Sequence, residues 1–336
     1  MHLTPVRRLA VLSATLSATF LATLGVAGCS KDRRTADAAA GGAAGAATKT
    51  IGVTLLTREH DFYRELEAGM REAAATHGYR LVVTSGDFDL AKQQSQVDNF
   101  LVQKVDAIVV CPVDSKGIAP AIEKANAAKI PVFTADIAAQ GGAIVSHVAS
   151  DNVQGGHLAA DYLAKAIGER GEVAIVGQPG LQSTIDRQAG FLAGMKAYPN
   201  VKVVATLDGG GVRDRALKVA DDLFQSHPTV AGVFAINDES ALGVLASARS
   251  HRAEQLVLVG YDASPEALRT IAAGGPFRAD VAQDPRAIGM RTIEAIVDHF
   301  AGKAATAVVS VPVKVVDAAA ARAMPAAPAA APAPAR

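Results

Sequence analysis

Residues 229–245 read Thr229-Val-Ala-Gly-Val-Phe-Ala-Ile-Asn-Asp-Glu-Ser-Ala-Leu-Gly-Val-Leu245, an apolar run that ends in a polar cluster. The continuous apolar run from Val230 to Ile236 predicts a strand buried on both faces. A helical pattern begins at Asn237-Asp-Glu, where an Asn or Asp side chain can accept from the free N–H groups of the new helix. Open α/β sheets bind their ligands at the carboxyl ends of parallel strands. The cluster is therefore either a helix cap alone or a ligand contact as well.

The same alternation of strand and helix recurs along the chain and predicts parallel, doubly wound sheets. Strands are expected at 50–56, 79–84, 105–110, 130–134 and 143–148, and helices at 61–77, 90–103 and 115–128. After a crossover near Ser150 the alternation starts again, with strands at 172–176, 201–207, 230–236, 256–260 and 277–282 and helices between them. A last helix is expected at 285–300, followed by one or two short strands within 308–316. Two such runs predict two similar α/β lobes.

The length and charge of the chain set broad limits. The 336 residues suit two domains, and half of them are hydrophobic, which is enough for a substantial core. Lys plus Arg and Asp plus Glu number 33 each, so the formal net charge is zero and nothing favours a nucleic-acid partner. The sequence contains no phosphate-binding loop and no His-Glu-x-x-His pair, and Ser150-Asp-Asn lacks the partner motifs of a penicillin-binding site. We therefore expect no cofactor, no metal and no catalysis.

The amino-terminal segment has the order of a secretory signal. Arg7-Arg8 precedes an apolar stretch from Leu9 to Val26, and small residues then lead to Cys29. Val26-Ala-Gly-Cys29 resembles the lipobox of bacterial lipoproteins, which implies that residues 1–28 are a signal peptide and that Cys29 is lipidated. An uncleaved membrane anchor is the alternative, since the apolar stretch is near the shortest length that can span a bilayer.

Two segments beside the folded body have low complexity. Residues 29–48 turn from polar to almost pure Ala and Gly, which indicates a flexible tether. Residues 317–336 are rich in Ala and Pro, which indicates a disordered or extended tail. The folded body is thus expected to span residues 49–316.

Polar side chains follow many of the predicted strands, where two facing lobes would meet. They are Asp136, Gln178, Asp208, Asn237, Asp262 and Gln283. Arg187 and the aromatic pair Phe62-Tyr63 are close to the starts of helices in the same pattern. Carboxylate and amide oxygens accept from hydroxyl groups, Arg and amide nitrogens donate to them, and aromatic rings can cover the apolar face of a sugar. The pattern favours a neutral, polyhydroxylated ligand.

Several longer stretches identify a family. They are Ser146-His-Val-Ala-Ser-Asp-Asn-Val-Gln-Gly-Gly156, Arg187-Gln-Ala-Gly-Phe191, Val233-Phe-Ala-Ile-Asn-Asp-Glu239, Val259-Gly-Tyr-Asp262 and Val281-Ala-Gln283. In these stretches the chain resembles the ribose-binding-protein-like group of type I periplasmic solute-binding proteins. The resemblance implies two Rossmann-like lobes joined by a three-crossover hinge and closing on a sugar. The implied N-terminal lobe is 49–150 plus 284–312, and the implied C-terminal lobe is 151–283 plus 313–316.

The resemblance also implies roles for single residues. Phe62 and Tyr63 match the ring-stacking aromatics of the family. Its polar contacts to sugar hydroxyls correspond to Asp136, Arg187, Asn237, Asp262 and Gln283. Departures from the family pattern affect four positions: His60 and Cys111 replace asparagines of ribose binders, Ile137 replaces an Arg, and Gly211 replaces a third aromatic. Another pentose or hexose, a polyol, or a deoxy or modified sugar is therefore as consistent with the sequence as ribose.

Each of these residues also has a purely structural interpretation. Phe62 could pack within its helix, Arg187 could pair with Asp186, and Asp262 could serve only as a turn residue. Cys111 is expected to be a small buried side chain, and His60 is either a ligand contact or a solvated loop residue. Residues 150–152 should form a hinge and a helix cap rather than part of the site.

The resulting hypothesis is an extracytoplasmic, lipid-anchored protein that binds sugar for an ABC importer. Lobe closure would trap a monosaccharide or related polyol, and the closed form would deliver it to a membrane permease driven by an ATPase. The protein is expected to be a monomer that contacts the membrane only through its lipid anchor. The alternative is a sugar-sensing receptor subunit that presents its closed form to a chemoreceptor or sensor kinase. A sugar-responsive repressor is disfavoured because a secretory signal, and no DNA-binding helix pair, precedes the body.

Overall fold

The computed structural model describes residues 48–324, which form two α/β lobes, each built on a six-stranded sheet. The predicted signal peptide, the predicted lipidation residue Cys29, the tether up to residue 47, and residues 325–336 lie outside the described residues. Within residues 48–324, no helix has both the length and the apolar character needed to cross a membrane.

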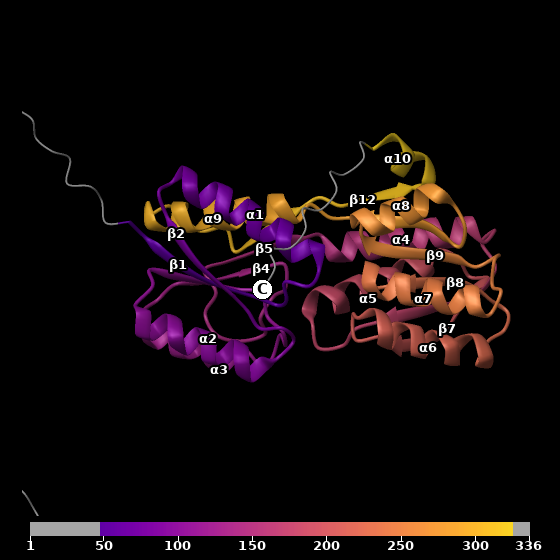
Figure 1. Cartoon of the computed structure of the whole chain (residues 1–336), viewed down its shortest axis with the longest axis horizontal. Coiled ribbons are helices and arrows are strands. Elements are labelled where there is room, and N and C mark those ends of the chain that lie inside the picture. Colours follow the sequence, from indigo (N-terminus) through magenta and orange to yellow (C-terminus); the bar gives the residue numbers. More distant parts are fainter. Residues whose placement is uncertain (1–47, 325–336) are drawn as a thin grey trace, which may run out of the picture. The chain divides into compact units, whose positions relative to one another are not determined.

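The first lobe contains a fully parallel sheet. Its strand order is β11 (Val308–Val311), β5 (Ser146–Ser150), β4 (Val132–Ala135), β3 (Ala107–Val110), β1 (Thr50–Leu55) and β2 (Arg80–Ser85). One face is covered by α1 (Asp61–Thr76) and α9 (Pro285–Phe300), and the other by α2 (Leu90–Gln103) and α3 (Ala119–Ala127) (Figure 1). This lobe is therefore a three-layer α/β/α unit.

The second lobe repeats this architecture. Its strand order is β12 (Lys314–Asp317), β10 (Phe277–Ala282), β9 (Val257–Asp262), β8 (Val230–Ala235), β6 (Gly171–Gly177) and β7 (Val201–Asp208), with only β12 antiparallel to its neighbour. One face is covered by α4 (Asn152–Ala166) and α5 (Gln182–Met195), and the other by α6 (Arg213–Ser226), α7 (Asp238–Ser250) and α8 (Pro265–Ala273). The predicted fold class, two lobes with doubly wound sheets, is confirmed.

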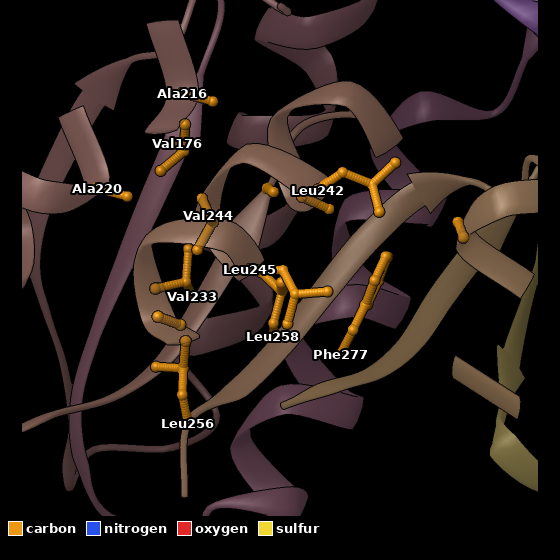
Figure 2. Packing of buried hydrophobic residues seen from close by; sticks show 14 of the residues in the cluster. Val176, Ala216, Ala220, Val233, Leu242, Val244, Leu245, Leu256, Leu258 and Phe277 are labelled. Carbon is orange, nitrogen blue, oxygen red and sulfur yellow. The ribbon is translucent and has the colours of Figure 1, made fainter. Parts of the chain in front are cut away.

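The central strands are apolar throughout because helices cover both of their faces. In β8, Val233 packs beneath α6 and α7, as Figure 2 shows, whereas the next residue, Phe234, packs beneath α4 and α5. The ring of Phe234 stacks on that of Phe191 with centroids 4.7 Å apart. Because successive side chains of a strand point to opposite faces, a strand between two helix layers needs an apolar residue at each position.

The chain passes between the lobes three times. β5 ends at Ser150 in the first sheet, and α4 then begins at Asn152 on the second. β10 ends in the second sheet, and α9 follows it on the first. The last passage contains Pro312, which separates β11 in the first sheet from β12 in the second. Proline has no N–H for a strand ladder and therefore suits the point where the chain changes sheets.

Two differences from the sequence prediction have a clear physical reason. The predicted helix 115–128 begins only at Ala119, because the Asp114 carboxylate accepts from the N–H groups of Lys116 and Gly117 and forms a turn first. The prediction of a disordered or extended tail from residue 317 is wrong for α10 (Ala318–Ala323). Asp317 caps this helix by accepting from the Ala320 N–H at 2.9 Å, and alanine is the best helix former.

His147 of β5 is a mostly buried histidine close to the first passage between the lobes. Its Nδ1 lies 2.9 Å from Thr134 Oγ1, and burial lowers the pKa of the ring to about 4. The folded chain therefore keeps this ring neutral over a pH range in which the unfolded chain, with an ordinary histidine pKa of about 6.5, already binds a proton.

We expect the free energy of unfolding to fall as the pH decreases from about 6.5 to about 4, because only the unfolded chain gains the His147 proton there. This difference in proton binding lowers the free energy of unfolding by up to about 3 kcal/mol as the pH falls from about 6.5 to about 4. Urea titrations across this range should show the loss in the natural chain and a smaller loss in His147→Gln. The exposed His157 provides the control, since His157→Gln should leave the pH profile unchanged. An identical profile in His147→Gln would contradict the assignment.

Candidate functional site

A small cavity is lined by side chains of both lobes. From the first lobe the lining residues are Leu56, His60, Phe62, Tyr63, Phe88, Asp136 and Ile137. From the second lobe they are Gln178, Leu181, Ser183, Thr184, Arg187, Asn237, Asp262 and Gln283.

The parallel sheets explain why these residues come together. Leu56 and Asp136 directly follow β1 and β4, Gln283 directly follows β10, and Asn237 lies two residues after the end of β8. The carboxyl ends of parallel strands meet at one edge of a sheet, so residues that are distant in sequence become neighbours there.

Arg187 is the most constrained of the lining residues. It is 4% exposed, and its Nε donates to Asn152 Oδ1 at 2.8 Å, while its Nη1 donates to the Ile236 carbonyl at 2.9 Å. Nη1 also lies 3.6 Å from Asp262 Oδ1, and the guanidinium lies 3.9 Å from the centre of the Tyr261 ring. The structural alternative of a pair with Asp186 is therefore wrong.

Two buried carboxyl groups line the cavity with Arg187. Tyr63 Oη donates to Asp136 Oδ2 at 2.6 Å, and Gln283 Nε2 donates to Asp262 Oδ1 at 2.7 Å. Burial raises the pKa of Asp136, and Arg187 opposes that rise. Burial also raises the pKa of Asp262, to about 8, again against the effect of Arg187. Both carboxyl groups therefore release their protons less readily than exposed aspartates do, despite the nearby Arg187 cation.

Asn237 combines the two roles that the sequence left open. Its Oδ1 accepts from the Ser240 N–H at 2.9 Å, which caps α7, and its Nδ2 donates to the Gly211 carbonyl at 3.0 Å. The residue also lines the cavity. Helix capping therefore fixes the position of a side chain at the wall of the cavity.

The two lobes are in contact beside the cavity. The Ser115 N–H donates to the Gly180 carbonyl at 3.0 Å, and the Gln182 N–H donates to Ser115 Oγ at 2.9 Å. Leu181, between these two residues, is 5% exposed and packs with the apolar cluster of the first lobe. The loop that precedes α5 is thus bound to the first lobe by backbone and side-chain contacts together.

Residues 51–304 match a family model described as periplasmic binding protein domain. The chain belongs to this family. The ribose import binding protein of Bacillus subtilis is 36% identical over 268 residues, which cover 79% of this chain and 86% of that one. The xylitol-binding protein of Mycolicibacterium smegmatis is 30% identical over 234 residues, which cover 69% of this chain and 67% of that one.

Solved structures of other periplasmic binding proteins share the fold. A solute-binding protein of an ABC transporter from Mycobacterium smegmatis, with bound glycerol, matches with a TM-score of 0.78 and 29% identity over 82% of this chain and 96% of that one. A carbohydrate transporter solute-binding protein from Agrobacterium radiobacter, in complex with D-arabinose, matches with a TM-score of 0.76 and 29% identity, covering 81% and 95%. The resemblance to ribose-binding-like type I proteins is confirmed.

One predicted site residue of this periplasmic binding protein does not line the cavity. All the residues predicted to contact the ligand line the cavity except Cys111. Cys111 is fully buried in the apolar cluster of the first lobe, close to Tyr63, which agrees with its interpretation as a small buried side chain.

Phe88 is an aromatic residue of the cavity that the sequence did not indicate. It lies in the loop between β2 and α2 with φ of 62°, and its ring meets that of His60 edge-on at 5.7 Å. A Cβ at Gly211 would lie 2.2 Å from Gln178 Oε1, so a side chain there would displace the end of the Gln178 side chain.

His60 lines the cavity and is not a solvated loop residue. Burial lowers the pKa of its ring, which favours the neutral imidazole that can both donate and accept. Among residues 48–324, no group of three His, Cys, Asp or Glu side chains is arranged to hold a metal ion.

Proposed function

We propose that this periplasmic binding protein captures a neutral monosaccharide, either a pentose, a hexose or a related polyol, between its lobes for an ABC importer. One observation carries the proposal: the second lobe lines the cavity mainly with polar side chains, and all the aromatic lining residues come from the first lobe. The first lobe also supplies most of the apolar lining, namely Leu56, Phe62, Phe88 and Ile137. A sugar ring likewise has a polar part, the hydroxyl groups at its edge, and an apolar part, the C–H bonds on its faces.

Charge at the cavity supports an uncharged ligand. The cation of Arg187 already lies beside Asp262, and Asp136 is also within its electrostatic influence. A phosphate ester or another anion would leave these carboxyls unbalanced, and a cation would face Arg187. Buried charges without partners are costly, so a neutral ligand fits this site best.

Gln283 supports hydroxyl groups as the contacting atoms. Its Nε2 is used by Asp262, but within residues 48–324 its buried Oε1 has no hydrogen-bond donor. Such an unmet acceptor costs about 1–3 kcal/mol. A ligand hydroxyl that donates to Gln283 Oε1 would remove this cost and would add to the affinity.

The relatives support the same ligand class. The names of the similar proteins include ribose import and xylitol binding, and the similar structures contain glycerol or D-arabinose. We extend sugar and polyol binding from those proteins to this chain. In this proposal closure of the lobes traps the ligand without breaking a bond, and the closed form then delivers it to the permease and its ATPase.

A thermal-shift screen tests the ligand class. D-ribose, D-arabinose, xylitol, glycerol and myo-inositol are added separately to the protein, with glucose 6-phosphate and an amino acid as charged controls. A ligand at a hundredfold excess over its Kd should stabilise the folded protein by about 2.7 kcal/mol and raise its melting temperature. Stabilisation by the charged controls alone would reject the proposal.

We expect Asp136→Ala and Asp262→Ala each to weaken binding of the best ligand by about 1–3 kcal/mol, because each change leaves a buried donor without its acceptor. Calorimetry on each variant measures the change. Asp186→Asn is the matched control, since Asp186 is adjacent to Arg187 in sequence but does not line the cavity. Unchanged affinity in both Ala variants would remove these residues from the proposed site.

The cellular placement belongs to the same proposal. Lipidation of Cys29 after removal of residues 1–28 would anchor a monomer at the outer side of a membrane and keep it beside its permease. Mass spectrometry of the protein from its native membrane should find a diacylated Cys29 at the amino terminus. A Cys29→Ser variant that still fractionates with membranes would argue against this anchor.

A further inference from the structure

The turn that carries Asp262 has a strained backbone. Asp262 has φ of 119° and Ala263 has φ of 61°, and neither residue is glycine. Residues in such conformations cost free energy and persist only where surrounding contacts hold them. Because this turn sets the distance between Asp262 and Arg187, whatever holds the turn also shapes the cavity.

Asp238 supplies the contact that holds the turn. Its Oδ2 accepts from the Ser264 N–H at 2.6 Å, directly after the strained residues. Asp238 is 4% exposed and is the first residue of α7. That helix is fixed by Leu242 and Leu245, which pack among side chains of the second sheet (Figure 2). The carboxyl of Asp238 therefore has a rigid support.

The other oxygen of Asp238 faces a second buried carboxyl group. Asp280 of β10 is 0% exposed, and Asp238 is its neighbouring carboxyl group. Within residues 48–324, no donor meets Asp238 Oδ1 or either oxygen of Asp280. Two charged carboxylates would repel each other strongly in such a place, and one proton between them removes the repulsion.

The surrounding charges favour the shared proton. Asp262 of β9 and Glu239 of α7 are neighbouring carboxyl groups, and Glu239 is paired with Arg213 of α6. The Arg187 cation pairs with Asp262, at 3.6 Å. Burial is the main cause of the raised pKa of Asp280, and the neighbouring Asp238 adds to it.

We propose that Asp238 and Asp280 share one proton and act together as positioning residues for Asp262, although neither side chain lines the cavity. The inference rests on the proposed function only in taking Asp262 as a ligand contact. The Asp280 O–H donates to ionised Asp238, which in turn accepts from the Ser264 N–H. When the pH rises and the proton leaves, two negative groups repel, the turn loosens and Asp262 loses its place opposite Arg187.

Two substitutions of Asp280 separate positioning from simple packing. In Asp280→Asn, the amide N–H₂ can donate to Asp238 without titrating, so D-ribose affinity at neutral pH should stay within about twofold of the natural chain. In Asp280→Ala, Asp238 loses its donor, and the affinity should fall by about tenfold or more. As the pH rises above neutral, the natural chain should lose affinity, whereas Asp280→Asn should lose much less. Exposed Asp222→Asn is the control and should follow the natural chain.

Two measurements need no ligand. Carbon-13 NMR of labelled aspartate should show, besides the raised titrations of Asp262 and Asp136, a further carboxyl group that titrates far above the ordinary range and is missing in Asp280→Asn. Hydrogen exchange of the Ser264 amide should be faster in Asp280→Ala and unchanged in Asp280→Asn. Absence of the high-titrating carboxyl, or equal Ser264 exchange in both variants, overturns the inference. If D-ribose, D-arabinose and xylitol all fail to bind the natural chain, the proposed ligand class fails, while these two measurements still decide the role of the pair.

Discussion

Arg187→Met should reduce sugar binding by about 3–5 kcal/mol, which is more than about 100-fold in Kd. Methionine approximates the length and bulk of the side chain but removes the charge beside Asp262, the donor to Asn152 and the donor to the Ile236 carbonyl. Three polar groups are then left in the interior with a partner missing. Calorimetry with the best ligand measures the loss, and circular dichroism checks that the variant is folded.

Arg187→Lys sharpens this test because it keeps the positive charge. An ammonium group cannot reproduce the planar fork that bonds to Asn152 and Ile236 at once, so affinity should still fall by about tenfold or more. Arg213→Met is the matched control. Arg213 pairs with Glu239 and Glu266 at the surface, and such pairs contribute about 0–1 kcal/mol. Equal binding by Arg187→Met and Arg213→Met would show that Arg187 does not organise the site.

Gly156→Ala should destabilise the fold by about 3 kcal/mol or more. Gly156 is in α4, where α4 packs closely against α5, and a Cβ there would lie 2.0 Å from the Arg187 carbonyl oxygen and 2.6 Å from the Phe191 nitrogen. Both obstacles are backbone atoms, so no side-chain rotation relieves the clash and the helices must separate. Equilibrium urea unfolding, followed by circular dichroism, measures the change.

The same substitution should also weaken binding in the fraction that remains folded. Separation of α4 from α5 moves Asn152 away from Arg187, and the 2.8 Å hydrogen bond between them is lost. Gln154→Ala on the exposed side of α4 should change stability by less than about 0.5 kcal/mol. A stable Gly156→Ala variant with natural affinity would contradict the close packing described here.

The sequence predicted the site residues that lie directly after the ends of strands. Asp136, Asn237 and Gln283 follow buried apolar runs, and the ends of parallel strands necessarily meet at one edge. Phe88 was missed because a left-handed backbone, which no local pattern requires, turns its ring towards His60. Leu181 was missed because its place depends on contacts with the other lobe.

Other residues had a role that only the folded chain reveals. Asn152 was predicted as hinge and cap, whereas Asp151 caps α4 and the Asn152 amide bonds to Arg187. Asp280 reads as one polar residue within a strand, and nothing in the pattern indicates that it faces Asp238. Pairing between side chains that are distant in the chain depends on sheet order and register, which apolar periodicity does not specify.

The contacts of Ser115 with Gly180 and Gln182 join the lobes outside the cavity lining. A residue change there would alter how often the empty protein adopts its binding-competent shape, and would multiply the Kd of each sugar by the same factor. The ratio of affinities for two competing sugars would stay constant. Substitutions at this contact can thus change the affinity for all sugars together during evolution, while the cavity residues keep the selectivity between sugars unchanged.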